Sequence, residues 1–111
     1  MKEFKTALII DDDKDLCMLV KSMLVNHITD VHCVHSLEEG KKKVAELMPD
    51  LILLDNNLPD GQGLHFIPVI KSVSPASEII LVSAFDNLNN QALAAGANAF
   101  LEKRKPVFKG K

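Results

Sequence analysis

The chain has 111 residues and a mass of 12.2 kDa, which is the size of one domain and excludes a multidomain enzyme. Hydrophobic residues make up 47% and charged residues 25%, a globular composition that argues against a disordered segment. The formal charge of −2 does not favour nucleic acid as a partner, and no apolar run is long enough to cross a membrane. Two cysteines form no disulfide framework, so we expect a reducing, cytoplasmic location.

Short apolar runs along the chain predict β-strands. Strands that are covered on both faces, as in a parallel sheet, have unbroken apolar sequences, whereas strands with one exposed face alternate apolar and polar residues. The predicted strands span residues 7–10, 31–34, 51–54, 79–82 and 99–101, and the second is the weakest of them.

The first two segments between these runs have helical patterns. Asp13 is placed to cap a first helix, which has an apolar stripe at helical spacing. Ser36 and Glu39 form a capping box that begins a second helix, and Pro49 ends it. The stripe of the first helix consists of Leu16, Leu19, Val20, Met23 and Leu24.

Two further helices complete the pattern. A third is expected over residues 63–73 despite Pro68, and a fourth begins at a cap, Asn87 or Asn89, and ends at Gly96. Strands that alternate with single helices predict an α/β fold, a doubly wound, five-stranded parallel sheet. We expect the flavodoxin-like strand order 2-1-3-4-5. Because the chain stops ten residues after the fifth strand, we expect the final helix to be missing or truncated and one face of the sheet to be thinly covered.

Polar side chains follow the predicted strands at the points where they end. Asp11 and Asp12 follow the first strand, Asp55 the third, Ser83 the fourth and Lys103 the fifth. Parallel strands end at one edge of the sheet, so we expect the three carboxylates to lie close together and to need a cation. An all-oxygen site suits Mg²⁺, with Mn²⁺ as a substitute. Each aspartate alone is also typical of a turn or a cap, but the combination favours a site.

Four stretches carry a resemblance to a known family: residues 7–13, 51–61, 81–84 and 96–103. The pattern most specific to this family is a turn after an apolar strand, together with the acidic pair upstream. The turn reads Asp55-Asn56-Asn57-Leu58-Pro59-Asp60-Gly61. The chain resembles the receiver domain of response regulators in two-component signalling. The resemblance extends over nearly all of residues 1–111, which we treat as one receiver domain, excised or truncated before a fifth helix.

The resemblance implies a role for each matching carboxylate. Asp55 would accept a phosphoryl group from the phosphohistidine of a sensor histidine kinase or a phosphotransfer protein. Asp12, Asp55 and the backbone carbonyl of Asn57 would bind Mg²⁺, and Asp11 would act on the metal mainly through water. The domain would be a signalling phosphoacceptor, not an enzyme, catalysing only its own phosphorylation and dephosphorylation. A fused output domain and a homodimer are further implied partners.

The resemblance also implies roles for residues around the phosphoryl group. Lys103 and the hydroxyl of Ser83 would bind its oxygens, and Phe100 would be the switch aromatic whose rotamer follows Ser83. Asn57 and Phe85 would flank the path of the water that hydrolyses the acyl phosphate. An equal alternative for Phe85 is a place in a partner surface, because loop aromatics often serve interfaces.

The sequence departs from the family pattern at the active lysine. In the family this lysine usually precedes a proline, whereas here the segment reads Lys103-Arg104-Lys105-Pro106. Counting forward from Gly96 selects Lys103, and counting back from Pro106 selects Lys105, about 6–7 Å further along an extended chain. We favour Lys103.

Other interpretations are less consistent with the sequence. The four histidines with Cys17 and Cys33 match no structural zinc spacing. Asp11-x-Asp13 resembles haloacid-dehalogenase phosphatases, but those have Thr or Val where this chain has Asp15. Flavodoxin shares the expected strand order, yet the chain has no phosphate loop and no Trp or Tyr to stack on a flavin. The main alternative is a receiver-like interaction module that is not phosphorylated in the cell.

Overall fold

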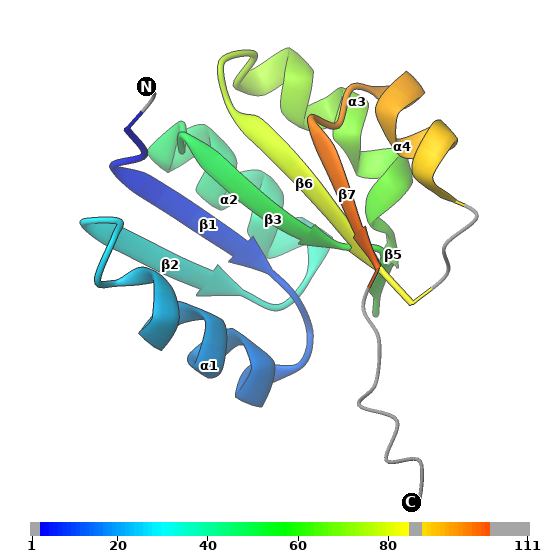
Figure 1. The fold of residues 1–111 in the computed structure, drawn as a ribbon. Helices are drawn as coiled ribbons and strands as arrows, with labels where there is room; N and C mark the ends of the chain where they lie inside the picture. The colour runs from blue at the N-terminus through cyan, green and yellow to red at the C-terminus, as the bar shows by residue number, and fades with distance from the viewer. Residues whose placement is uncertain (1–2, 85–87, 103–111) are drawn as a thin grey trace, which may run out of the picture.

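Five parallel strands form the central sheet of the computed structural model, which describes residues 3–84 and 88–102 (Figure 1). Their order is β2-β1-β3-β6-β7, with a separate two-stranded hairpin, β4-β5, beyond β3. The predicted doubly wound order is therefore confirmed, while the hairpin was not predicted. The strands are β1 (Thr6–Ile10), β2 (Asp30–Val34), β3 (Leu51–Asp55), β4 (Asn57–Leu58), β5 (Gly61–Gln62), β6 (Glu78–Ser83) and β7 (Ala99–Glu102).

The first two helices begin at the predicted caps. The Asp13 carboxylate accepts the N–H of Leu16 at 3.1 Å, and the Ser36 hydroxyl accepts the N–H of Glu39 at 3.1 Å. Each cap satisfies one of the N–H groups that a helix leaves without an internal partner. Met48 ends the second helix in a left-handed conformation (φ 46°), just before the proline. The helices are α1 (Lys14–Leu24), α2 (Leu37–Leu47), α3 (Gly63–Val73) and α4 (Asn89–Ala95).

The start of α4 differs from the prediction. Leu88 is its N-cap and Asn89 its first helical residue, with no side-chain cap bond, so the predicted cap by Asn89 is wrong. Leu88, at the N-cap position, already has helical dihedral angles (φ −92°, ψ −2°), whereas a residue that caps with its side chain is usually extended. Asn87 lies outside the described residues. Gly96 ends α4 at φ 116° as predicted, and α3 continues through an exposed Pro68.

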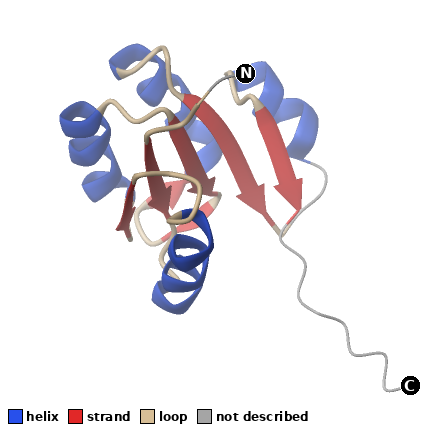
Figure 2. Ribbon diagram, turned by 60° about the vertical axis from the view of Figure 1, so that its left-hand side comes forward, coloured by secondary structure: helices blue, strands red, loops and turns tan. Residues whose placement is uncertain are grey.

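The two faces of the sheet are covered unequally (Figures 1 and 2). Helices α2, α3 and α4 lie on one face, and in the described part of the chain α1 is the helix on the other. Alternate strand residues, including Leu8, Ile52 and Leu81, are fully buried beneath the three helices. The smaller core under α1 consists of Ala7, Ile9, Cys17, Ile28, Val31 and Leu51. The larger core therefore holds the strands in place, and the α1 face is the more open side.

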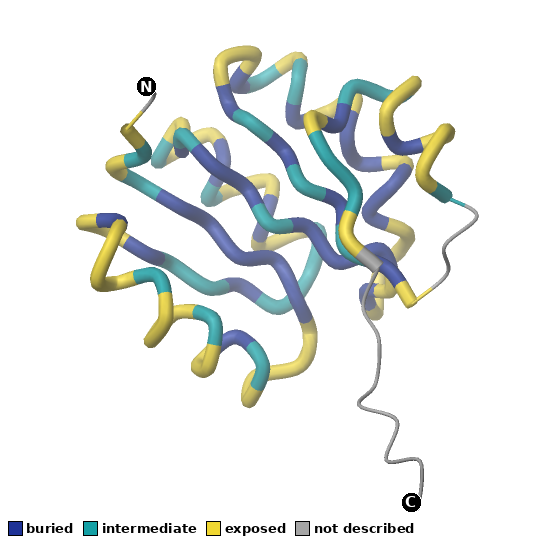
Figure 3. The backbone as a smooth tube through the Cα atoms, in the orientation of Figure 1, coloured by how far each residue is buried: buried dark blue, intermediate teal, exposed yellow. Residues whose placement is uncertain are grey.

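The predicted apolar stripe of α1 is only partly buried (Figure 3). Leu19 and Met23 are 58% and 60% exposed, whereas Cys17, which was not in the stripe, is buried. Leu16 and Val20 instead line a cavity of about 270 Å³ between α1 and the sheet. Its other lining residues are Ile9, Asp11, Leu53, Asp55, Val82 and Leu101. Helix α1 packs against β1 and β2, so the side chains along one edge of its apolar stripe do not reach the strands and stay exposed.

None of the described helices combines the length and the hydropathy that a membrane span requires.

Candidate functional site

Three carboxylates converge at the carboxyl ends of β1 and β3. Asp55 is the last residue of β3, and Asp11 and Asp12 directly follow β1, its parallel neighbour in the sheet. One oxygen from each of the three carboxylates lies within 4.8 Å of the others. Asp11 and Asp55 are each 5% exposed, and Asp12 is open to solvent. The predicted cluster is therefore present in the structure, with two buried members and one that faces water.

The acidic cluster has the chemistry of a divalent-cation site. Negative charges held this close repel one another unless a cation or a proton compensates them. The donors are all carboxylate oxygens, which hard cations such as Mg²⁺ and Ca²⁺ prefer over soft metals. The exposed position of Asp12 leaves access for an ion that retains some of its water. The residues present thus fit a divalent metal ion.

The backbone of Asp11 is held by both β2 and α1. Its N–H donates to the Val34 carbonyl at 3.1 Å, and its carbonyl accepts bonds from His35 Nδ1 at 2.9 Å and Cys17 Sγ at 3.4 Å. One oxygen of its carboxylate accepts the N–H of Asp13 at 2.9 Å. These contacts fix the direction in which the Asp11 carboxylate points, so it is preorganised beside Asp55.

Asn56, for which the sequence predicts no role, anchors the loop after β3. Its side chain is buried, and its Oδ1 accepts the N–H of Leu64 at 3.0 Å, in the first turn of α3. Its backbone N–H donates to Val82 at 2.9 Å, and its carbonyl accepts from Gly63 at 2.8 Å. Asn56 thereby joins the end of β3 to β6 and α3. The partner of the side chain lies eight residues away, so no local sequence pattern reveals the contact.

Asp60, at the tip of the β4-β5 hairpin, binds the first turn of α2. Its two carboxylate oxygens accept the N–H groups of Leu37 at 2.8 Å and Glu38 at 3.0 Å. These backbone hydrogen bonds, first that of Leu37 and then that of Glu38, lower the pKa of Asp60 below its ordinary value. Asp60 belongs to the specific turn in the sequence, but its contact with α2 is visible only in the fold.

Three of the other predicted site residues are among the residues that the structure describes. Ser83 ends β6, is fully buried, and lies one position beyond Val82, the register partner of Asp55. Asn57 is exposed in β4, and Phe100 in β7 packs against the larger core. Ser83 and Asn57 thus share the carboxyl edge of the sheet with the acidic cluster. Lys103, its alternative Lys105, and Phe85 lie outside the described residues.

The thiol of Cys33 donates to the backbone carbonyl of Cys17 at 3.6 Å, and the thiol of Cys17 donates to the carbonyl of Asp11 at 3.4 Å. Burial is the main cause that raises the pKa of Cys17 to about 12, followed by the neighbouring Cys33. Burial also raises the pKa of Cys33. Within residues 3–84 and 88–102, the acidic cluster is the group of three or more metal-ligating side chains that the structure brings together.

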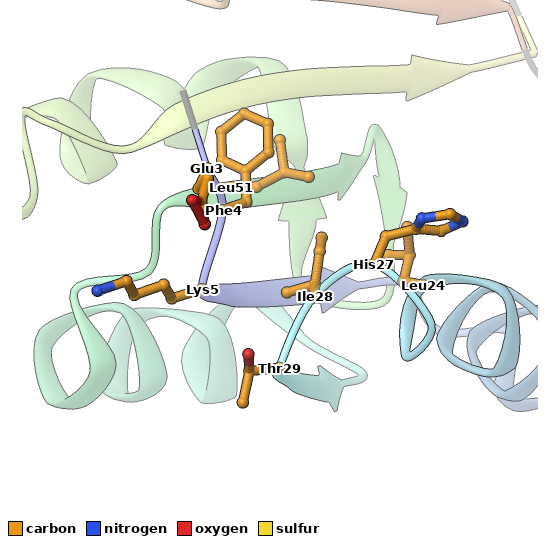
Figure 4. A pocket seen from close by; sticks show the side chains of 8 residues that line it. All are labelled: Glu3, Phe4, Lys5, Leu24, His27, Ile28, Thr29 and Leu51. Carbon is orange, nitrogen blue, oxygen red and sulfur yellow. The ribbon is translucent and has the colours of Figure 1, made fainter. Parts of the chain in front are cut away.

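A second cavity lies at the opposite end of the sheet (Figure 4). It has a volume of about 540 Å³, and apolar side chains such as Phe4, Ile28 and Leu51 form part of its lining. The side chain of Lys5 points away from Phe4 and Leu51. The full lining is Glu3, Phe4, Lys5, Leu24, His27, Ile28, Thr29 and Leu51. This cavity is next to the amino ends of β1 and β3, so it is separate from the carboxylates at their carboxyl ends.

Comparison with known proteins places these observations in a family. The model of the response regulator receiver domain matches residues 7–107. The response regulator protein PilR of Pseudomonas aeruginosa is 35% identical over 107 residues, which cover 95% of this chain and 24% of PilR. The KDP operon transcriptional regulatory protein KdpE of Escherichia coli is 32% identical over 98 residues, covering 87% of this chain and 44% of KdpE.

The structural comparison agrees. The crystal structure of a two-component response regulator from Clostridium difficile matches with a TM-score of 0.84 at 30% identity, covering 92% of this chain and 85% of that one. The chain spans less than half the length of PilR and KdpE. The family model, the strand order and the acidic cluster agree, and this chain belongs to the response regulator receiver domain family.

Proposed function

We propose that this chain is a Mg²⁺-dependent phosphoacceptor that receives a phosphoryl group on Asp55 from the phosphohistidine of a histidine kinase or a phosphotransfer protein. Receiver domains are phosphoacceptors and not classical enzymes, so the proposed reactions are confined to the domain's own aspartate. The observation that carries the proposal is the position of Asp55, buried at the end of β3 with an oxygen within 4.8 Å of oxygens of Asp11 and Asp12. Cytoplasmic location, a fused output domain and a homodimer are part of the same proposal.

The reaction assigns a separate task to each carboxylate. An oxygen of Asp55 attacks phosphorus and forms the O–P bond of an acyl phosphate, while the P–N bond breaks and its electron pair leaves with the imidazole. Asp12, Asp55 and the Asn57 carbonyl would hold Mg²⁺, and Asp11 would hold its water. When bound, the ion neutralises charge on the phosphoryl oxygens and helps to align them. Mn²⁺ would substitute, because it accepts the same oxygen donors.

The remaining residues would respond to the phosphoryl group. The hydroxyl of Ser83 would donate a hydrogen bond to one phosphoryl oxygen, and the ammonium group of Lys103 would form an ion pair with another. Phe100, half-buried against the larger core, would change rotamer when the Ser83 hydroxyl moves toward the phosphate. The acidic cluster would thus be linked to the surface of β7 and α4, where a partner or output domain would detect the change.

Phosphorylation by a small donor tests the proposal directly. The protein is incubated with acetyl phosphate and Mg²⁺ and analysed by intact-mass and peptide mass spectrometry. We expect a gain of one phosphoryl group on the peptide that contains Asp55, and no gain when EDTA replaces Mg²⁺. A protein that binds Mg²⁺ but gains no phosphate under these conditions would support the alternative, an interaction module that is not phosphorylated.

The identity of the active lysine can be decided by two substitutions. Lys103→Ala is expected to leave Mg²⁺ affinity equal or tighter, because a competing cation is removed, and to weaken the conformational response to phosphorylation. Lys105→Ala is expected to change little. Calorimetric Mg²⁺ titration and NMR spectra with and without acetyl phosphate measure both effects. The reverse pattern would assign the role to Lys105.

Phe85 is expected to lengthen the lifetime of the acyl phosphate. A large apolar side chain beside the attacking water would exclude or poorly solvate it, so Phe85→Ala should shorten the lifetime. Asn57 substitutions should act according to the side chain introduced, because a polar group there can hold the water. Phosphate release is measured for the wild type and Phe85→Ala at the same Mg²⁺ concentration. Equal rates would support the interpretation of Phe85 as a partner-surface residue.

A further inference from the structure

The proposed metal ligand Asn57 belongs to a hairpin that is not part of the central sheet. Asn57 pairs with Gln62 and Leu58 with Gly61, and these two strands form a separate antiparallel sheet. An isolated two-stranded hairpin is marginally stable, so its position must come from contacts elsewhere. The location of the Asn57 carbonyl therefore depends on what anchors the hairpin.

The hairpin is anchored at its base and at its tip. At the base, Asn56 binds the first turn of α3 through its side chain, at 3.0 Å from the Leu64 nitrogen. At the tip, both carboxylate oxygens of Asp60 accept N–H groups from the first turn of α2, at 2.8 and 3.0 Å. Gly61 also approaches α2, since a Cβ at this position would lie 2.9 Å from Leu37 Cδ1. The hairpin is thus held by hydrogen bonds to the N-termini of two helices, α3 at its base and α2 at its tip.

The α2 N-terminus divides its free N–H groups between two acceptors. Ser36 accepts the N–H of Glu39, as an ordinary cap does. The N–H groups of Leu37 and Glu38 go instead to Asp60, more than twenty residues further along the chain. A carboxylate at this end also meets the positive end of the helix dipole. One cap therefore serves α2 alone, whereas the other ties α2 to the loop that carries Asn57.

We propose that Asp60 is a positioning residue: by fixing the hairpin tip to α2, it sets the place of the Asn57 carbonyl relative to Asp12 and Asp55 and thereby the affinity of the site for Mg²⁺. The inference rests on the proposed function, because it concerns the same metal site. Residues that orient metal ligands without touching the metal commonly contribute about 10–100-fold to affinity or activity. Asp60 acts in this way through the short stretch of hairpin backbone, Leu58 and Pro59, that joins it to Asn57.

The paired variants Asp60→Ala and Ser36→Ala test the role. Both remove an acceptor from the α2 N-terminus, but only Asp60→Ala releases the hairpin. Mg²⁺ affinity is measured by calorimetry, because the chain has no Trp or Tyr for intrinsic fluorescence. Thermal stability and the Mg²⁺ concentration that gives half-maximal phosphorylation by acetyl phosphate are measured alongside. We expect Asp60→Ala to weaken Mg²⁺ binding by about tenfold or more and Ser36→Ala to leave it within about twofold, with both variants less stable.

Asp60→Asn provides the conservative comparison. Its amide oxygen can accept one of the two N–H groups, so its Mg²⁺ affinity is expected between those of the wild type and Asp60→Ala. This variant also carries the test if Asp60→Ala does not fold. Mg²⁺ affinity that stays at the wild-type value in Asp60→Ala, or in Asp60→Asn if only that variant folds, would overturn the inference and reduce Asp60 to a helix cap. An equal loss in Ser36→Ala would also overturn it.

The same measurements separate this inference from the proposed function. A wild type that binds Mg²⁺ in the calorimeter but gains no phosphate contradicts the phosphoacceptor proposal alone. The calorimetric affinities of the Asp60 variants then still decide whether Asp60 positions the site. Conversely, a wild type that is phosphorylated normally, with unchanged Mg²⁺ dependence in Asp60→Ala, contradicts only the role of Asp60.

Discussion

Asp55→Asn is expected to abolish phosphorylation by acetyl phosphate, because the amide that replaces the carboxylate is not nucleophilic. The variant should remain folded, since Asn and Asp are nearly the same size. Without Mg²⁺ its melting temperature should equal or exceed that of the wild type, because one of three crowded negative charges is removed. Mass spectrometry after incubation with the donor, and thermal unfolding with and without Mg²⁺, measure the two effects.

Asp13→Asn is the matched control for this change. It removes the same charge from a neighbouring carboxylate, which caps α1 and is not in the cluster of three. Because asparagine is also a good N-cap, this variant should keep its stability and take up phosphate as the wild type does. Phosphate uptake by Asp55→Asn at the wild-type rate would assign the nucleophile to another residue.

Gly63→Ala is expected to have the largest effect on stability. A Cβ on Gly63 would lie 2.3 Å from the carbonyl oxygen of Asp55 and 2.9 Å from Leu54 Cγ. The nearest atom is backbone at the end of β3, which cannot rotate away as a side chain can. Overpacking of this kind typically costs about 1–3 kcal/mol, which corresponds to a melting temperature lower by several degrees. Relief of this clash would also move the backbone of Asp55, so phosphorylation of the folded protein should slow.

Gly40→Ala is the control for this second prediction. A Cβ on Gly40 would lie 2.9 Å from Ile10 Cδ1, the flexible end of a side chain that can adjust. Gly40 also lies within α2, where alanine is favoured over glycine by about 1 kcal/mol. The two contributions oppose each other, so little net change is expected. Urea unfolding of both variants measures the difference, and equal stability of Gly63→Ala and the wild type would contradict the predicted clash.

The amino-acid sequence by itself determined the five strands of the central sheet and the acidic cluster. Buried parallel strands have unbroken apolar sequences, so four of the five strands are evident from hydrophobic runs alone. Residues directly after such strands share one edge of the sheet, and this rule brought Asp11, Asp12 and Asp55 together. The caps at Asp13 and Ser36 were also predictable, because each binds an N–H only three residues away.

The tertiary structure decided the features that depend on contacts between distant residues. The periodicity of α1 predicted an apolar stripe that includes Leu19 and Met23, but both are exposed because burial depends on where the helix sits over the sheet. The roles of Asn56 and Asp60 likewise depend on the first turns of α3 and α2, eight and more than twenty residues away. A sequence pattern registers neighbours along a helix or strand, whereas these bonds exist only after the sheet has brought separate elements together. The sequence therefore determined which groups can do the chemistry, and the packing of α2 and α3 against the β3 loop decided how those groups are held.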